Sequence, residues 1–150
     1  MKTPKAAPRT GAPAPPARTV PVRSAADIVT ARQQGRSMGA SLQFSSGELT
    51  MIATAISEVA RNIVEHAGQG EIEIAVDLDH GRPGLLIIAR DQGPGIADIA
   101  RAMQVGYSTA KGLGLGLPGA RQLMDEFSVA SELGKGTVIT MKKWEPWYAK

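Results

Sequence analysis

With 150 residues and no cysteine, the chain is the size of one domain and can form neither a disulfide framework nor a thiolate zinc site. Its net charge of +3 belongs to the first 22 residues, because the remaining 13 basic and 14 acidic side chains balance to −1, which argues against a nucleic-acid-binding role. No apolar run approaches the roughly 18 residues that span a bilayer and no signal-peptide core is visible, so we expect a cytoplasmic protein without membrane contact.

The first segment in chain order, residues 1–22, is expected to be a tail. It holds six of the ten prolines, together with Lys, Arg, Ala and Thr. Such a stretch cannot bury enough apolar surface to offset its ordering entropy. We therefore predict a disordered, proline-rich basic tail over residues 1–22 and a folded domain over residues 23–150. The tail could anchor an acidic partner or simply be solvated.

Helices and strands are then predicted from the spacing of apolar residues and from capping and turn signals. The expected helices cover residues 24–39, 45–68, 96–105 and 117–127, and the third of them is the weakest. The expected strands cover residues 71–79, 85–89, 128–131 and 137–143. Three or four helices against one face of about four mixed or antiparallel strands make an α+β, two-layer sandwich.

Glu58 and Asn62 are four residues apart on the second predicted helix, so they share a face. On a helical wheel they lie roughly opposite the centre of the apolar stripe. They could form part of a solvated polar face, which is common on helices. They could also be two oxygen donors that reach one ligand, and an Asn oxygen suits Mg²⁺ when phosphates supply most of the remaining charge.

The stretch Asp91-Gln-Gly-Pro-Gly-Ile96 follows a predicted central strand. Asp at the end of a strand often closes an Asx-turn. The alternative is that Asp91 accepts a hydrogen bond from an exocyclic amine such as that of adenine. Gly93 and Gly95 would then allow the backbone to approach the ring closely.

A third motif, YSTAKGLGLGLPG, covers residues 107–119. Its glycines at 112, 114 and 116 precede a predicted helix that has Pro118 in its first turn, where proline is tolerated. Backbone N–H groups and a helix N-terminus together can bind an anion. The spacing is neither that of a P-loop nor that of the dinucleotide fingerprint, and taken alone the stretch could be a linker.

The order of these three motifs, followed by Gly136-Thr137 in a late strand, resembles the GHKL (Bergerat) ATP-binding fold over residues 23–143. Within that superfamily the similarity is greatest to the RsbT-type switch kinases. It is carried by SEVARN at 57–62, DQGPGI at 91–96, GYSTAKGLGLGLPGARQLMDEF at 106–127 and GKGTVITMKKW at 134–144.

This resemblance implies an ATP-dependent serine/threonine kinase that uses Mg²⁺ and acts as a partner switch in bacterial stress signalling. Its substrates would be STAS-domain proteins of the RsbS and RsbR kind. When freed from them it would activate an RsbU-like phosphatase, as a monomer or weak dimer. The alternative is an RsbW-like anti-sigma factor that sequesters a sigma factor and phosphorylates its antagonist. A detached histidine-kinase catalytic domain is a further interpretation.

The resemblance also implies residue roles. Glu58 would orient the attacking hydroxyl and Asn62 would bind Mg²⁺, while Asp91 would bind the adenine amine and Thr137 would support the base. Gly93 and Gly95 would lie under the base, and the lid over the phosphates would contain Ser108, Thr109, Lys111, Gly112, Gly114 and Gly116. Lys111 could supply positive charge to the phosphates or be solvated.

Overall fold

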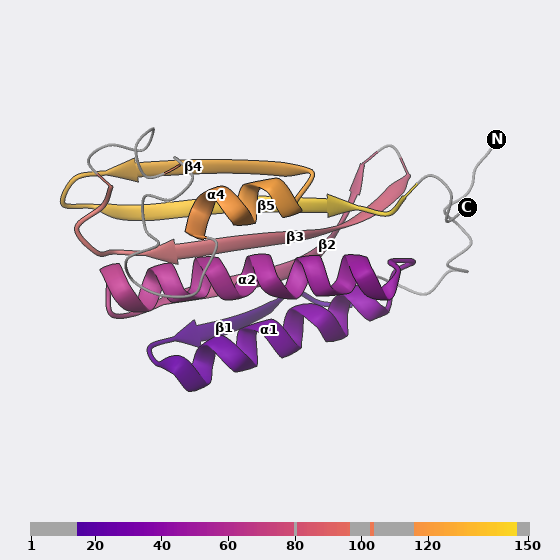
Figure 1. The fold of residues 1–150 in the computed structure, drawn as a ribbon, viewed down its shortest axis with the longest axis horizontal. Coiled ribbons are helices and arrows are strands. Elements are labelled where there is room, and N and C mark those ends of the chain that lie inside the picture. Colours follow the sequence, from indigo (N-terminus) through magenta and orange to yellow (C-terminus); the bar gives the residue numbers. More distant parts are fainter. Residues whose placement is uncertain (1–14, 80, 97–102, 104–115, 147–150) are drawn as a thin grey trace.

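A computed structural model describes residues 15–79, 81–96, 103 and 116–146. In this part of the chain, one antiparallel sheet has the strand order β1-β2-β3-β5-β4, and helices cover one of its faces (Figure 1). The elements are β1 (Arg18–Val22), α1 (Ala25–Ala40), α2 (Ser46–His66), β2 (Gly70–Asp79), β3 (Arg82–Asp91), α4 (Gly116–Leu123), β4 (Glu126–Glu132) and β5 (Gly136–Trp144). The expected α+β, two-layer sandwich is confirmed, with five antiparallel strands in place of about four.

The additional strand is β1, which corrects the expected boundary of the tail. Val20 and Val22 are buried, and Val20 pairs with Ile72 of the neighbouring strand β2. Pro21 is tolerated because β1 is an edge strand, where a missing N–H need not interrupt a ladder. The folded domain therefore includes Arg18–Val22, and the prediction that residues 1–22 form a tail is wrong for these five residues. Residues 1–14 lie outside the described residues.

The two N-terminal helices follow the predicted ranges closely. Ser45 caps α2 through a complete capping box with Glu48. At the start of α1 no capping box forms: the Asp27 carboxylate accepts at 2.9 Å from the N–H of Arg23, which precedes the N-cap, and Ser24 makes no side-chain cap. In α2 the Ser45 hydroxyl thus satisfies the Glu48 N–H, which the first helical turn leaves unpaired.

The helix over 117–127 was predicted too long. α4 ends at Leu123, and β4 begins at Glu126. Phe127 and Val129 are half-buried and alternate with exposed neighbours, which is the pattern of an edge strand. The helix expected over 96–105 falls almost entirely outside the described residues.

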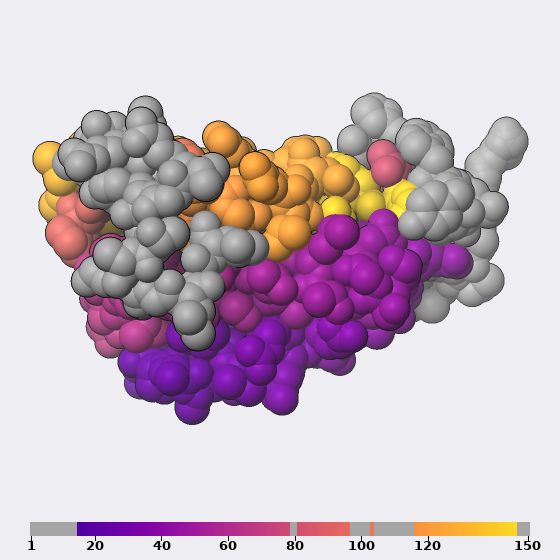
Figure 2. All heavy atoms as spheres, in the orientation of Figure 1, coloured from indigo at the N-terminus to yellow at the C-terminus, as the bar shows by residue number. Residues whose placement is uncertain are grey.

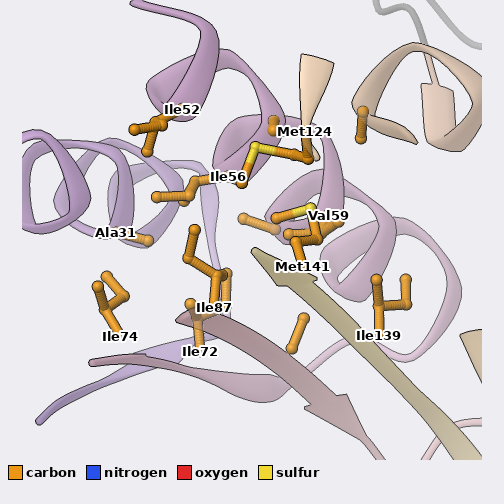
Figure 3. Close-up of a cluster of buried hydrophobic side chains, with 14 of the residues drawn as sticks. Ala31, Ile52, Ile56, Val59, Ile72, Ile74, Ile87, Met124, Ile139 and Met141 are labelled. Atoms are coloured by element: carbon orange, nitrogen blue, oxygen red, sulfur yellow. The ribbon is translucent and has the colours of Figure 1, made fainter. Parts of the chain in front are cut away.

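The core lies between the helices and the sheet. Figure 2 shows side chains of α1, α2 and α4 side by side across the covered face. Beneath them, branched side chains of α2 meet the inward-facing side chains of β2, β3 and β5 (Figure 3). The labelled members of this cluster are Ala31, Ile52, Ile56, Val59, Ile72, Ile74, Ile87, Met124, Ile139 and Met141. Within the described residues, no helix is long and apolar enough to cross a bilayer.

Candidate nucleotide-binding site

Five residues form a row across one end of the sheet. Val22, Gly70, Asp91, Thr137 and Ser131 are register partners in β1, β2, β3, β5 and β4. Cross-strand partners share a face, and residues two positions along each strand do so too. The buried Ile139, two residues after Thr137, shows that this is the helix-covered face. The structure therefore brings Asp91 and Thr137 side by side.

Asp91 forms the Asx-turn that its sequence context predicts. Its Oδ1 accepts a hydrogen bond from the Gly93 N–H at 2.9 Å. Among the described residues, Oδ2 has no hydrogen-bond donor. The turn is thus compatible with ligand binding, because it fixes the carboxylate through one oxygen and leaves the second available as an acceptor.

Neighbouring parts of the protein leave no room for a side chain at Gly93 or Gly95. A Cβ on Gly93 would lie 2.6 Å from the Cβ of Ala67, at the end of α2. Gly95 has a φ of +81°, and a Cβ there would collide with the carbonyl oxygen of Glu132. The turn after β3 is therefore packed between the end of α2 and the β4–β5 hairpin. Packing within the protein is thus sufficient to explain both glycines, whether or not a ligand approaches them.

Ser131 joins this turn to the hairpin. Its Oγ accepts from the Ile96 N–H at 2.7 Å, donates to the Gly136 carbonyl at 3.1 Å and lies 2.9 Å from the Thr137 Oγ1. The Gly134 N–H also donates to the Pro94 carbonyl at 2.9 Å. Sequence reasoning missed Ser131. Its only signal is the alternation of β4, and the register that places it beside Thr137 cannot be derived from one strand.

Glu58 is buried, with 8% of its surface exposed. Its Oε1 accepts hydrogen bonds from the Gly116 N–H at 3.1 Å and from Arg61 Nη1 at 3.0 Å. On the helical wheel Glu58 lies opposite the apolar stripe, which would suggest an exposed side chain, but in the structure this side chain is buried. The wheel considers only the sheet as a neighbour, whereas the start of α4 packs beside this side of α2.

Arg61 is a second residue of the site that sequence reasoning did not select. It lies one turn after Glu58 and pairs with it across the i, i+3 spacing. With 39% of its side chain exposed, Arg61 places a positive charge at the border between the buried carboxylate and solvent. The i, i+3 spacing of Glu58 and Arg61 within SEVARN could have predicted this pair from the sequence.

Asn62 is half-buried on the turn of α2 that follows Glu58. In the described residues, no group of three or more His, Cys, Asp or Glu side chains could hold a metal ion. A metal bound beside Asn62 would therefore take most of its oxygen ligands from a bound molecule. This donor set fits Mg²⁺ carried by a polyphosphate, which keeps few protein ligands.

Gly116 is the first residue of α4 and has a φ of +71°. Pro118 lies in the first turn of the helix, as predicted. The C-terminal end of the glycine-rich stretch is thus fixed to the carboxylate of Glu58. The other predicted lid residues lie outside the described residues: Ser108, Thr109, Lys111, Gly112 and Gly114.

Comparison with known proteins agrees with this geometry. The family model described as histidine kinase-like ATPase domain matches residues 20–143. The chain is 54% identical to the serine/threonine-protein kinase RsbT of Bacillus subtilis over 118 residues, which are 79% of this chain and 89% of that protein. It is 36% identical to the anti-sigma F factor of Geobacillus stearothermophilus over 111 residues, which are 69% and 75% of the two chains.

Solved structures show the same fold. The RsbU and RsbW domains of a Mycobacterium tuberculosis protein align with a TM-score of 0.57 at 21% identity, over 86% of this chain and 32% of that longer chain. At this identity the likeness concerns the fold alone.

Proposed function

Because the chain belongs to the histidine kinase-like ATPase domain family, and within it to the RsbT-type serine/threonine-protein kinases, we propose that it transfers the γ-phosphoryl group of ATP to a hydroxyl of a STAS-domain partner protein. One observation carries the proposal. The Asp91–Thr137 pair lies beside the C-terminal half of α2, which carries Glu58 and Asn62 (Figure 1), and the Gly116 N–H donates a hydrogen bond to Glu58.

The base would bind at the row of residues across the sheet. Asp91 Oδ2 would accept from the exocyclic amine of adenine, and Thr137 would lie beside it. Gly70 belongs to the same row, and a Cβ there would lie 3.1 Å from the Asp91 Cβ and 2.9 Å from Ile63. Such a Cβ would also collide with the Arg90 carbonyl oxygen, so the backbone itself excludes a side chain at this position beside Asp91.

Phosphoryl transfer depends on positioning and on neutralising charge. The hydroxyl oxygen of the acceptor forms a bond to the γ-phosphorus as the bond to the β,γ-bridging oxygen breaks, ADP leaves, and the hydroxyl proton is released to solvent. Glu58 would hold the acceptor hydroxyl in line, while Arg61 and the Gly116 N–H fix the direction of its carboxylate. Backbone N–H groups of the glycine-rich stretch would donate to the phosphate oxygens and exclude water.

Magnesium would be held by the Asn62 side-chain oxygen together with phosphate oxygens of ATP. When bound, it neutralises charge that develops on the phosphates. We infer both partners from the similarity to RsbT-type kinases. The acceptors would be STAS-domain proteins, and the downstream partner would be a phosphatase that the kinase activates when it is released from them. We place this activity in the cytoplasm, where ATP is available.

The proposal is tested by incubating the protein with Mg·ATP and purified STAS-domain proteins encoded in the same genome. We expect ATP-dependent phosphate on a serine or threonine, stable in acid. Acid-labile phosphate would instead indicate histidine phosphorylation. A pull-down with the same proteins, a sigma factor and an RsbU-like phosphatase distinguishes the two partner classes. Capture of the sigma factor alone would support an anti-sigma role and contradict the kinase switch.

A further inference from the structure

We propose that Ser131 is a positioning residue that fixes the direction of the Thr137 hydroxyl, and that it thereby makes the site select a 6-amino purine over a 6-oxo purine. This inference rests on the proposed function, because it assumes that the base of a nucleotide binds beside Asp91 and Thr137. It assigns a role to a residue outside the three motifs from which that function was inferred.

The argument begins with the protons of the Ser131 hydroxyl. Serine has one hydroxyl proton and can accept two hydrogen bonds. The Ile96 N–H uses one acceptor position at 2.7 Å. The Gly136 carbonyl at 3.1 Å can only accept, so this contact requires the Ser131 proton. The remaining contact, 2.9 Å to Thr137 Oγ1, must then be donated by Thr137.

Only this arrangement satisfies all three contacts together. It uses the single proton of Thr137 inside the network, so Thr137 Oγ1 presents lone pairs alone to anything else beside it. Thr137 is 4% exposed, and in such a place an unsatisfied hydroxyl is unfavourable. The backbone therefore sets which way the Thr137 proton points, through Ser131.

Asp91 adds a second acceptor at the same register position. An ionised carboxylate only accepts hydrogen bonds, and its Oδ1 is held by the Gly93 N–H. The paired Asp91 and Thr137 thus present acceptors and no donor. This edge matches the N–H₂ group at position 6 of adenine, and it repels the carbonyl oxygen at position 6 of hypoxanthine or guanine.

Loss of the Ser131 hydroxyl would release the Thr137 proton. Thr137 could then rotate and donate to a 6-oxo group, which would weaken the discrimination. The size of the effect should correspond to about one neutral hydrogen bond, on the order of fivefold in the affinity ratio.

The test measures equilibrium dissociation constants of the full chain for ATP and for ITP, which differ in the substituent at position 6 and in the proton that hypoxanthine carries on N1. We expect the wild-type protein to prefer ATP by at least about tenfold. Ser131→Ala should lower this preference by on the order of fivefold. Ser131→Thr, which keeps a hydroxyl, should retain it, and so should Ser128→Ala, a matched control on the exposed side of β4.

A double-mutant cycle separates positioning from general damage to the fold. In a Thr137→Val background, Ser131→Ala should change the ATP-to-ITP ratio by less than about twofold, because the hydroxyl through which Ser131 acts is gone. If Ser131→Ala weakens both nucleotides equally, or changes the ratio as much without the Thr137 hydroxyl, the inference is overturned. Equal wild-type affinity for ATP and ITP would also overturn it. A wild-type protein that binds no ATP would contradict the proposed function itself.

Discussion

Glu58 shows how burial changes the interpretation of a single residue. On the sequence, a carboxylate on the polar side of an amphipathic helix is compatible with a solvated surface. In the structure it is buried and accepts from a backbone N–H and a guanidinium. Burying a charge is unfavourable unless it is paired and hydrogen-bonded. The fold supplies these partners, which is what a positioned functional carboxylate requires.

Asn62 provides the first prediction at the scale of a residue. Asn62→Ala removes the only side-chain oxygen that we assign to magnesium. The affinity for ATP should fall by on the order of tenfold when Mg²⁺ is present and change little in EDTA, because the lost interaction requires the metal. Titration calorimetry with and without Mg²⁺ measures both affinities. Equal losses in the two conditions would show that Asn62 contacts ATP in another way.

At the scale of elements, the site depends on the contact between the turn after β3 and the β4–β5 hairpin. Two hydrogen bonds, from the Ile96 N–H to Ser131 Oγ and from the Gly134 N–H to the Pro94 carbonyl, hold this contact together with the close backbone approaches at Gly95 and Gly136. The last residues of β3 and β4 and the first residues of β5 are thereby held against one another. The register of the sheet end, and with it the pairing of Asp91 and Thr137, follows from this contact.

Two glycines of the hairpin give a matched pair of variants. Gly136 has a φ of +108°, and a Cβ there would collide with the Asp91 carbonyl and lie 2.8 Å from the Gln92 Cα. Gly134 has a φ of +79°, and a Cβ there would have open space for 4 Å around it. Gly136→Ala should destabilise the fold by more than about 2 kcal/mol and weaken ATP binding, whereas Gly134→Ala should cost about 1 kcal/mol from backbone strain alone.

Urea unfolding measures the two free energies, and nucleotide titration measures the two affinities. Similar losses of stability and of affinity in both variants would mean that the contact between Gly136 and the end of β3 does not organise the site.

At the scale of the whole molecule, the domain begins earlier than the sequence indicated. β1 covers the edge of β2 with two buried valines. The proline-rich and basic composition around it obscured an alternation of only five residues. A composition average over 22 residues cannot detect so short a strand, because most of the averaged residues lie outside it.

Substitution of Val22 tests whether the folded domain begins before residue 23. Val22→Ala removes a fully buried side chain and should lower the free energy of unfolding by about 2 kcal/mol. Thr19→Ala on the exposed side of the same strand should change it by less than about 0.5 kcal/mol. If residues 18–22 were a tail in solution, both substitutions would be neutral, which chemical denaturation would detect.

The rest of the architecture follows closely from local patterns. The long helical periodicity of α2 and the strong alternation in β2 predict those elements to within a few residues, because each pattern extends over several turns or pleats. The motifs selected Asp91 and Thr137, which the sheet register pairs, and their roles toward a nucleotide stay a prediction. The patterns could not give the burial of Glu58 or the position of Ser131, since both arise from contacts between elements that are distant in the sequence.

The central claim is that the buried carboxylate of Glu58 serves phosphoryl transfer and not nucleotide binding. Glu58→Gln tests it most directly, because the amide oxygen can still accept from the Gly116 N–H while the charge is lost. Single-turnover transfer from radiolabelled ATP to the STAS-domain partner should slow by on the order of 100-fold, with the dissociation constant for ATP within about threefold of wild type. Transfer at the wild-type rate by Glu58→Gln would contradict the account.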